Sequence, residues 1–203
     1  MKKLLTLAAL VGATTVSFAQ GTVNFANSAS TLISAGGAAA PLSGVVPINY
    51  MLFIAPSTTV NAAGQASTFT DPVFQTPSGV GNVNSATTAG RMPTLNGYVT
   101  TGSGTVDFLV RGWSANAGAT WAAALAFYNN GNPAQDMWIG QSLIGNDIVL
   151  GGGATPATTL FGAGASSVGG FNLALIQAPV PEPSSMVLAG LGAASLLLFR
   201  RRK

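Results

Sequence analysis

Short hydrophobic runs broken by glycine, proline and asparagine fill the middle of the chain, a pattern typical of β-strands joined by turns. The run at residues 48–55, INYMLFIA, is hydrophobic at odd and even positions alike, as in a strand buried on both faces. Two further strands are predicted at residues 105–113 and 170–177. Weaker candidates lie at residues 22–25, 80–83, 97–100, 138–143 and 147–150.

The strand predicted at residues 105–113 divides its side chains between two faces. Val106, Phe108 and Val110 alternate on one face, so we expect that face to point into a core. Asp107 and Arg111 lie four residues apart on the other face. We expect them to form a solvent-side ion pair, which would contribute little stability.

Residues 120–131, TWAAALAFYNNG, depart from the strand pattern because they contain four alanines and no proline. The ending Asn129-Asn130-Gly131 suits a helix C-terminus, although Asn130-Gly131 is also a common hairpin turn. We favour a short helix and keep the hairpin as the alternative.

About eight strands with glycine and proline turns predict an all-β fold, an antiparallel β-sandwich with one short helix. This body spans residues 20–179. It is flanked by a distinct N-terminal segment, residues 1–19, and a distinct C-terminal segment, residues 180–203.

The N-terminal segment has the three parts of a secretory signal peptide. Lys2 and Lys3 form the positive region, residues 4–16 the hydrophobic region, and Ala19 the last residue before a cut that leaves Gln20 first. A first transmembrane helix is the alternative, but the hydrophobic run is shorter than the roughly 20 residues of a membrane span. We therefore expect signal peptidase to process the chain during export.

The charges of the chain gather at its ends. Between residues 20 and 180 only two arginines and four aspartates occur, a net charge of −2, so the body carries no basic patch for nucleic acid. The chain contains no cysteine, so we expect its stability to rest on a packed core and not on disulfides.

The C-terminal segment combines a Pro-Glu-Pro unit at Pro181, Glu182 and Pro183 with a 14-residue hydrophobic run at residues 186–199. A basic cluster follows, formed by Arg200, Arg201, Arg202 and Lys203. As a helix the run would measure about 21 Å, shorter than the roughly 30 Å hydrocarbon core, and the cations would hold its end in the cytoplasm.

These features, in this order at the end of the chain, resemble the PEP-CTERM sorting signal of Gram-negative bacteria. The resemblance implies that exosortase, a membrane-embedded cysteine protease, processes the chain after transient residence in the inner membrane. Pro181, Glu182 and Pro183 would be its recognition motif, residues 186–199 the membrane helix and the basic cluster the stop-transfer signal. A permanent membrane anchor is the alternative.

The body also resembles a group of PEP-CTERM proteins of similar length, through GTVNFAN after the signal, VRGWSANAGATW, a later GQS and a closing Phe-x-Leu strand. The function of that group is not established, so this resemblance implies a related fold and points to no particular active site.

Candidate chemistry in the body is sparse. Without histidine or cysteine the chain cannot form a Ser-His-Asp triad, a thiol protease site or a zinc site, and we expect no metal and no cofactor. Glycoside hydrolysis needs only two carboxylates, so an Asp-based hydrolase stays open as a second alternative. The carboxylates concerned are Asp71, Asp107, Asp136 and Asp147.

The three tryptophans, Trp113, Trp121 and Trp138, could stack on sugar rings, although burial in the core is the commoner fate of tryptophan in a β-sandwich. The sequence thus predicts an exported, non-catalytic structural protein of the cell surface or extracellular matrix. The alternative is a carbohydrate-binding module for the cell surface or exopolysaccharide.

Overall fold

The computed structural model describes residues 21–57, 64–94, 98–100, 104–130, 135–152, 154–164 and 166–178. The predicted signal peptide, its cut between Ala19 and Gln20, and the predicted sorting segment lie outside these residues.

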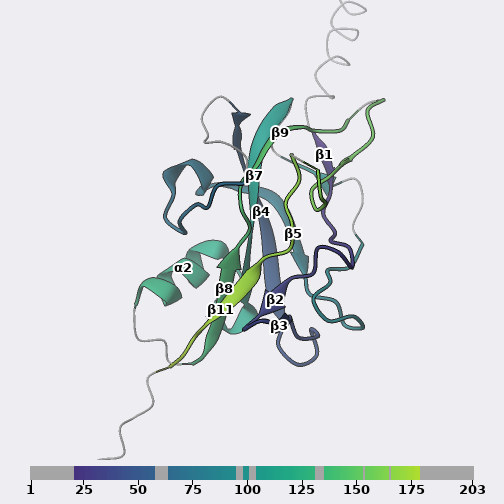
Figure 1. The fold of residues 1–203 in the computed structure, drawn as a ribbon. Coiled ribbons are helices and arrows are strands. Elements are labelled where there is room, and N and C mark those ends of the chain that lie inside the picture. The colour runs from purple at the N-terminus through teal and green to yellow at the C-terminus, as the bar shows by residue number, and fades with distance from the viewer. Residues whose placement is uncertain are drawn as a thin grey trace, which may run out of the picture.

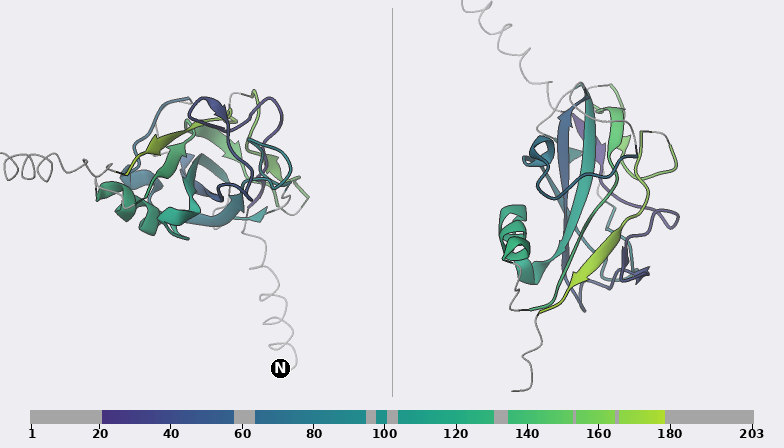
Figure 2. Two further views of the ribbon diagram at one scale, coloured as in Figure 1. Left: turned by 90° about the horizontal axis from the view of Figure 1, so that it is seen from below. Right: turned by 60° about the vertical axis from the view of Figure 1, so that its left-hand side comes forward.

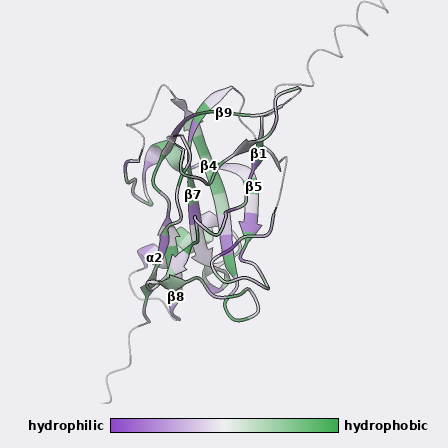
Figure 3. Ribbon diagram, turned by 45° about the vertical axis from the view of Figure 1, so that its right-hand side comes forward, coloured by the Kyte–Doolittle hydropathy of each residue, from purple (hydrophilic) through white to green (hydrophobic). Residues whose placement is uncertain are grey.

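Two long antiparallel strands, β4 (Ile48–Pro56) and β7 (Thr105–Ser114), form the centre of the body (Figure 1). They pair without interruption from Ile48 opposite Ser114 to Pro56 opposite Val106. The hydropathy colouring in Figure 3 marks β4 as largely hydrophobic, as its sequence predicts. This pair organises the larger of two sheets.

The larger sheet is mixed and has the strand order β3-β2-β11-β8-β7-β4-β5, with β9 also paired to β7. All of its pairs are antiparallel except that of β11 with β2. Its further strands are β2 (Ser34–Ala35), β3 (Ala38–Ala39), β5 (Pro77–Val83), β8 (Met137–Gln141), β9 (Gly145–Val149) and β11 (Asn172–Ile176).

The smaller sheet has three short strands in the order β10-β1-β6. Every strand predicted from the sequence is present, and the all-β class is confirmed. The pattern missed β2, β3 and β10, each of only two residues. The strands of the smaller sheet are β1 (Thr22–Asn24), β6 (Tyr98–Val99) and β10 (Thr158–Thr159).

The helix prediction is also confirmed, because residues Trp121–Asn129 form α2 and not a hairpin. The Thr120 side chain caps its first turn by accepting a hydrogen bond from the Ala123 backbone N–H, at 3.3 Å. Two short 3₁₀ helices complete the helical elements of the described residues, η3 (Pro72–Phe74) and η4 (Ala115–Ala117).

Both faces of β7 are buried, and each faces its own hydrophobic core. Even-numbered residues such as Phe108 face a first core shared with Tyr50 of β4 and Phe25, next to β1. Odd-numbered residues such as Leu109 and Trp113 face a second core. The long strands are therefore the middle layer of the body.

The second core is covered by α2 and by the segment at residues 64–76, which includes η3 (Figure 2). Trp121 of α2 and Phe74 of η3 are buried against this face of the sheet. The body is therefore not a sandwich of sheets alone, because a helix and an irregular segment cover the second core where a sandwich would have strands.

Strand β11 lies inside the larger sheet, between β2 and β8, although it is the last strand among the described residues. Gly140 of β8 allows its close approach, because a Cβ atom there would lie 2.3 Å from the Asn172 carbonyl oxygen. Two residues beyond β11, the Ala178 backbone N–H donates to Asp136 Oδ1, at 2.8 Å. The body therefore binds the chain beyond the end of β11, at Ala178.

None of the helices in the described part of the chain has the length and hydrophobicity to cross a membrane.

Replacing Phe108 by Ala should lower the free energy of unfolding by about 3–5 kcal/mol, because its ring is fully buried in the first core. Val149 on the neighbouring strand β9 is 57% exposed, so Val149→Ala should change the free energy of unfolding by about 0.5 kcal/mol or less. Urea unfolding of both variants makes the comparison. Equal losses would show that the first core does not carry the stability.

Candidate functional site

Arg111 and Asp107 are both buried on the face of β7 that carries the second core. Arg111 is 0% and Asp107 is 1% exposed, so the prediction of a solvent-side ion pair is wrong. The alternation along β7 was correct, but α2 and segment 64–76 cover the face that we expected to meet solvent. Two of the six charges of the body are therefore inside it.

The Arg111 guanidinium donates three hydrogen bonds, all to uncharged acceptors. Nε bonds to Gln141 Oε1 on the adjacent strand β8, at 3.1 Å. Nη1 bonds to the Phe74 carbonyl oxygen at 2.7 Å, and Nη2 to the Thr68 carbonyl oxygen at 3.1 Å. The guanidinium therefore ties segment 64–76 to the sheet at two points.

Two aromatic rings enclose the same guanidinium. Its central carbon lies 4.6 Å from the ring centroid of Phe53 and 4.6 Å from that of Trp121. Such contacts stabilise a cation through the negative faces of the rings. Burial lowers the pKa of Arg111 to about 10, while the negative charge of Asp71 raises it, so the group stays charged at neutral pH.

A network of hydrogen bonds extends from Arg111 into segment 64–76. Gln141 Nε2 donates to the Ser67 carbonyl oxygen, and the Ser67 hydroxyl donates to Asp71 Oδ2 at 2.7 Å. Asp71 Oδ1 in turn accepts from the Val73 backbone N–H, at 3.0 Å, and so caps η3. Sequence reasoning missed this network, because Arg111, Gln141 and segment 64–76 lie far apart along the chain.

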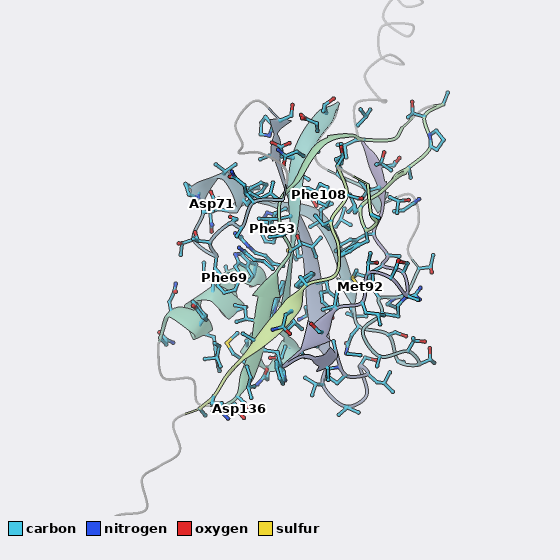
Figure 4. All side chains as sticks on the ribbon, viewed as in Figure 1. Phe53, Phe69, Asp71, Met92, Phe108 and Asp136 are labelled. Carbon is cyan, nitrogen blue, oxygen red and sulfur yellow. The ribbon has the colours of Figure 1, made fainter. Side chains whose placement is uncertain are left out.

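An open pocket of about 400 Å³ lies beside this network, between segment 64–76 and the C-terminal half of α2. We call it the side pocket. Its two aromatic side chains, Phe69 and Tyr128, meet edge to face with their ring centroids 5.2 Å apart. Phe69 is labelled in Figure 4, above α2. The residues that line the side pocket are Ser67, Thr68, Phe69, Thr70, Tyr128 and Gln141.

Asp107 is held at the point where the pairing of β7 with β9 is irregular. Its Oδ1 accepts a hydrogen bond from the Asp147 backbone N–H at 2.9 Å, whereas Oδ2 has no hydrogen-bond partner among the described residues. Burial raises the pKa of Asp107, the charge of Asp147 raises it further, and the hydrogen bond opposes both.

The tryptophans do not form a sugar-stacking row. Trp113 is 0% and Trp121 is 3% exposed, and the two rings meet at a centroid distance of 5.7 Å inside the second core. Trp138 is partly buried and packs against the first core, on the opposite side of the sheet. Core packing, the commoner fate of tryptophan, is therefore confirmed for Trp113 and Trp121.

The four aspartates do not converge on one cleft. Asp71 caps η3 and Asp136 binds the Ala178 backbone N–H at the other end of the body, far apart in Figure 4. Asp107 and Asp147 are close, but Asp107 is buried. Within the described ranges, no three side chains of aspartate, glutamate, histidine or cysteine come together to hold a metal.

Residues 179–203 match the family model of the PEP-CTERM protein-sorting motif. The chain carries a C-terminal PEP-CTERM motif. The match includes Pro181, Glu182 and Pro183 and the basic cluster from Arg200 to Lys203, so the predicted resemblance is confirmed. Comparisons with curated proteins and with solved structures found no significant match.

The PEP-CTERM motif begins directly after a residue that the body binds. Ala178 is bound to Asp136, and the match starts at residue 179. The membrane helix at residues 186–199 and the roles of the individual PEP-CTERM residues stay predictions.

Replacing Arg111 by Lys should lower the free energy of unfolding by about 2–4 kcal/mol, because an ammonium group cannot reproduce the planar set of three hydrogen bonds. Arg91→Lys is the matched control, since Arg91 is only partly buried, and it should cost about 0.5 kcal/mol or less. Denaturant titration gives both values. A loss for Arg111→Lys no larger than that of the control would mean that the network is not structural.

Asp107→Asn should raise the melting temperature at pH 7, because it removes a buried negative charge. The folded state keeps the Asp107 proton above the ordinary pKa of 3.8, so the stability that this proton contributes is present at lower pH and lost as the pH rises through the folded pKa. The advantage of the Asn variant should therefore vanish below about pH 3.5, where the carboxyl is mostly protonated in the unfolded chain too. Calorimetry of both proteins across this range tests the claim, and a difference independent of pH would contradict it.

Proposed function

We propose that this chain is an exported protein that an exosortase sorts through residues 179–203, and whose body serves as a non-catalytic structural or adhesive component of the cell surface or extracellular matrix. The PEP-CTERM motif carries the proposal, because it implies export and sorting to the cell surface. The role of the body is the part that extends beyond the motif.

Export begins, in this proposal, with removal of residues 1–19 by signal peptidase, so that the mature chain starts at Gln20. The C-terminal segment then resides briefly in the inner membrane before exosortase cuts it. Exopolysaccharide is a further candidate partner of the released body.

The position of β11 supports cleavage without damage to the body. Strand β11 ends at Ile176 and Ala178 is bound to Asp136, so the described sheet is formed entirely by residues that precede the PEP-CTERM motif. Pro181 follows Ala178 by three residues, which can span at most about 10 Å. Exosortase must therefore reach a site close to the folded body, and it can remove the tail without opening the sheet.

A structural role is supported by the low charge of the body. With six charged residues between positions 20 and 180, of which Asp107 and Arg111 are buried, neighbouring copies experience little electrostatic repulsion. A non-catalytic role is supported by the separation of the aspartates, since Asp107 is buried, Asp71 caps η3 and Asp136 binds Ala178 at the other end of the body.

Intact mass measurement of the protein from cells with and without the exosortase tests the sorting proposal. The wild-type chain should start at Gln20 and end near residues 181–185 when the protease is present, and keep its C-terminal segment when it is absent. Glu182→Ala should keep the segment in both strains, whereas Gln177→Ala, an exposed change just before the motif, should be processed normally. If the wild-type chain keeps Arg200 to Lys203 in both strains, the sorting proposal is wrong and the C-terminal segment is a permanent anchor.

A further inference from the structure

The side pocket combines the properties of a binding site for an uncharged, hydroxyl-rich ligand. Its volume of about 400 Å³ lies within the roughly 300–1,000 Å³ usual for small-molecule sites. The side chains that line it are aromatic, hydroxyl or amide groups, and none of them is charged. A charged ligand would leave water there without meeting a counter-charge among the lining side chains, so the lining favours a neutral one.

The aromatic side chains provide an apolar surface in the lining of the pocket. Tyr128 and Phe69 are each partly exposed, and Phe69 also packs on Trp121, with ring centroids 5.8 Å apart. A pyranose ring presents C–H groups on its faces and hydroxyls around its rim. The faces can pack on an aromatic ring while the hydroxyls bond to the polar groups alongside it.

Several polar groups of the pocket are available to a ligand. Thr68 and Thr70 are exposed, and their hydroxyls, like that of Tyr128, make no hydrogen bond to other described residues. Gln141 is different, because both ends of its amide are engaged, by Arg111 and by the Ser67 carbonyl oxygen. The hydroxyls can therefore exchange water for a ligand while Gln141 stays fixed.

The Arg111 network gives this pocket a rigid wall. A buried cation costs several kcal/mol of desolvation, and hydrophobic groups of the same volume often stabilise a core better. Here the cation binds the Thr68 carbonyl oxygen and the Gln141 amide, which belong to two of the residues that line the pocket. A wall that is already held in place lowers the entropy cost of binding a ligand. This gain explains why position 111 carries an arginine, although a hydrophobic residue would suit a buried position better.

We infer that the side pocket between segment 64–76 and α2 binds one or two rings of a neutral saccharide, with Tyr128 as the stacking residue and Arg111 as a positioning residue. This inference goes beyond the proposed function, because it assigns the body a ligand class and a site. In this inference Tyr128 and Phe69 provide the sugar-stacking surface, and not the tryptophans that the sequence suggested.

The test is calorimetric titration of the full-length chain, purified in a detergent without a sugar headgroup. The probes are tetrasaccharides of glucose, mannose and galactose, with tetragalacturonate as the acidic comparison and a neutral tetrapeptide as the protein-like one. At least one neutral tetrasaccharide should bind with a dissociation constant between about 1 μM and 1 mM. Tetragalacturonate and the tetrapeptide should bind at least about tenfold more weakly. This assay is independent of sorting, so it can fail while sorting succeeds, or succeed while sorting fails.

Two variants and a control locate the site. Tyr128→Ala should weaken binding about tenfold or more, and Thr70→Val, which keeps the side-chain shape, should weaken it by about two- to tenfold. Phe127→Ala removes the adjacent ring of the same helix, which does not line the pocket, and should leave affinity within about twofold. Thermal melts confirm that each variant is folded.

The inference fails if no neutral tetrasaccharide binds the folded wild type at concentrations up to about 10 mM. It also fails if Phe127→Ala weakens binding as much as Tyr128→Ala and Thr70→Val, or if the tetrapeptide or tetragalacturonate is preferred.

Discussion

The side of the molecule that carries the second core depends on the hydrogen bonds of one buried, charged guanidinium. Arg111 lies on the central strand, where Phe53 and Trp121 enclose it and three uncharged acceptors receive its hydrogen bonds. Two of these acceptors belong to segment 64–76, which has little regular structure of its own. The segment therefore keeps its position through a side chain that reaches it from a distant strand.

The same interaction gives the two faces of the sheet different characters. The first core is closed by hydrophobic packing among strands and loops, as Phe25, Tyr50 and Phe108 show. The second core combines aromatic packing with a charge, and it lies next to the side pocket. The buried charge thus lies on the face beside the pocket, so we assign binding to that face, while both cores contribute to stability.

Much of the fold was predictable from the sequence, because strands such as β4 and β7 carry long hydrophobic runs and α2 is rich in alanine. Strands β2, β3 and β10 were not, since two residues of alanine, serine or threonine carry neither periodicity nor a hydrophobic run. The burial of Asp107 and Arg111 could not be predicted either. Alternation along β7 places them on one face, but it cannot distinguish solvent from a second layer that arrives from residues 64–76 and α2. The side pocket depends on that second layer, so sequence reasoning missed it for the same reason. The PEP-CTERM motif could be predicted because its residues are contiguous in the sequence.

The most direct test of the account is hydrogen–deuterium exchange, resolved by peptide, of the wild type and Arg111→Lys under native conditions. If Arg111 holds segment 64–76 to the sheet, the variant should lose protection at backbone amides such as those of Asp71 and Phe74, which are hydrogen-bonded within that segment. The amides that pair β4 with β7 should exchange as slowly as before. Unchanged protection of segment 64–76, or equal loss throughout the sheet, would contradict the central role assigned to the buried guanidinium.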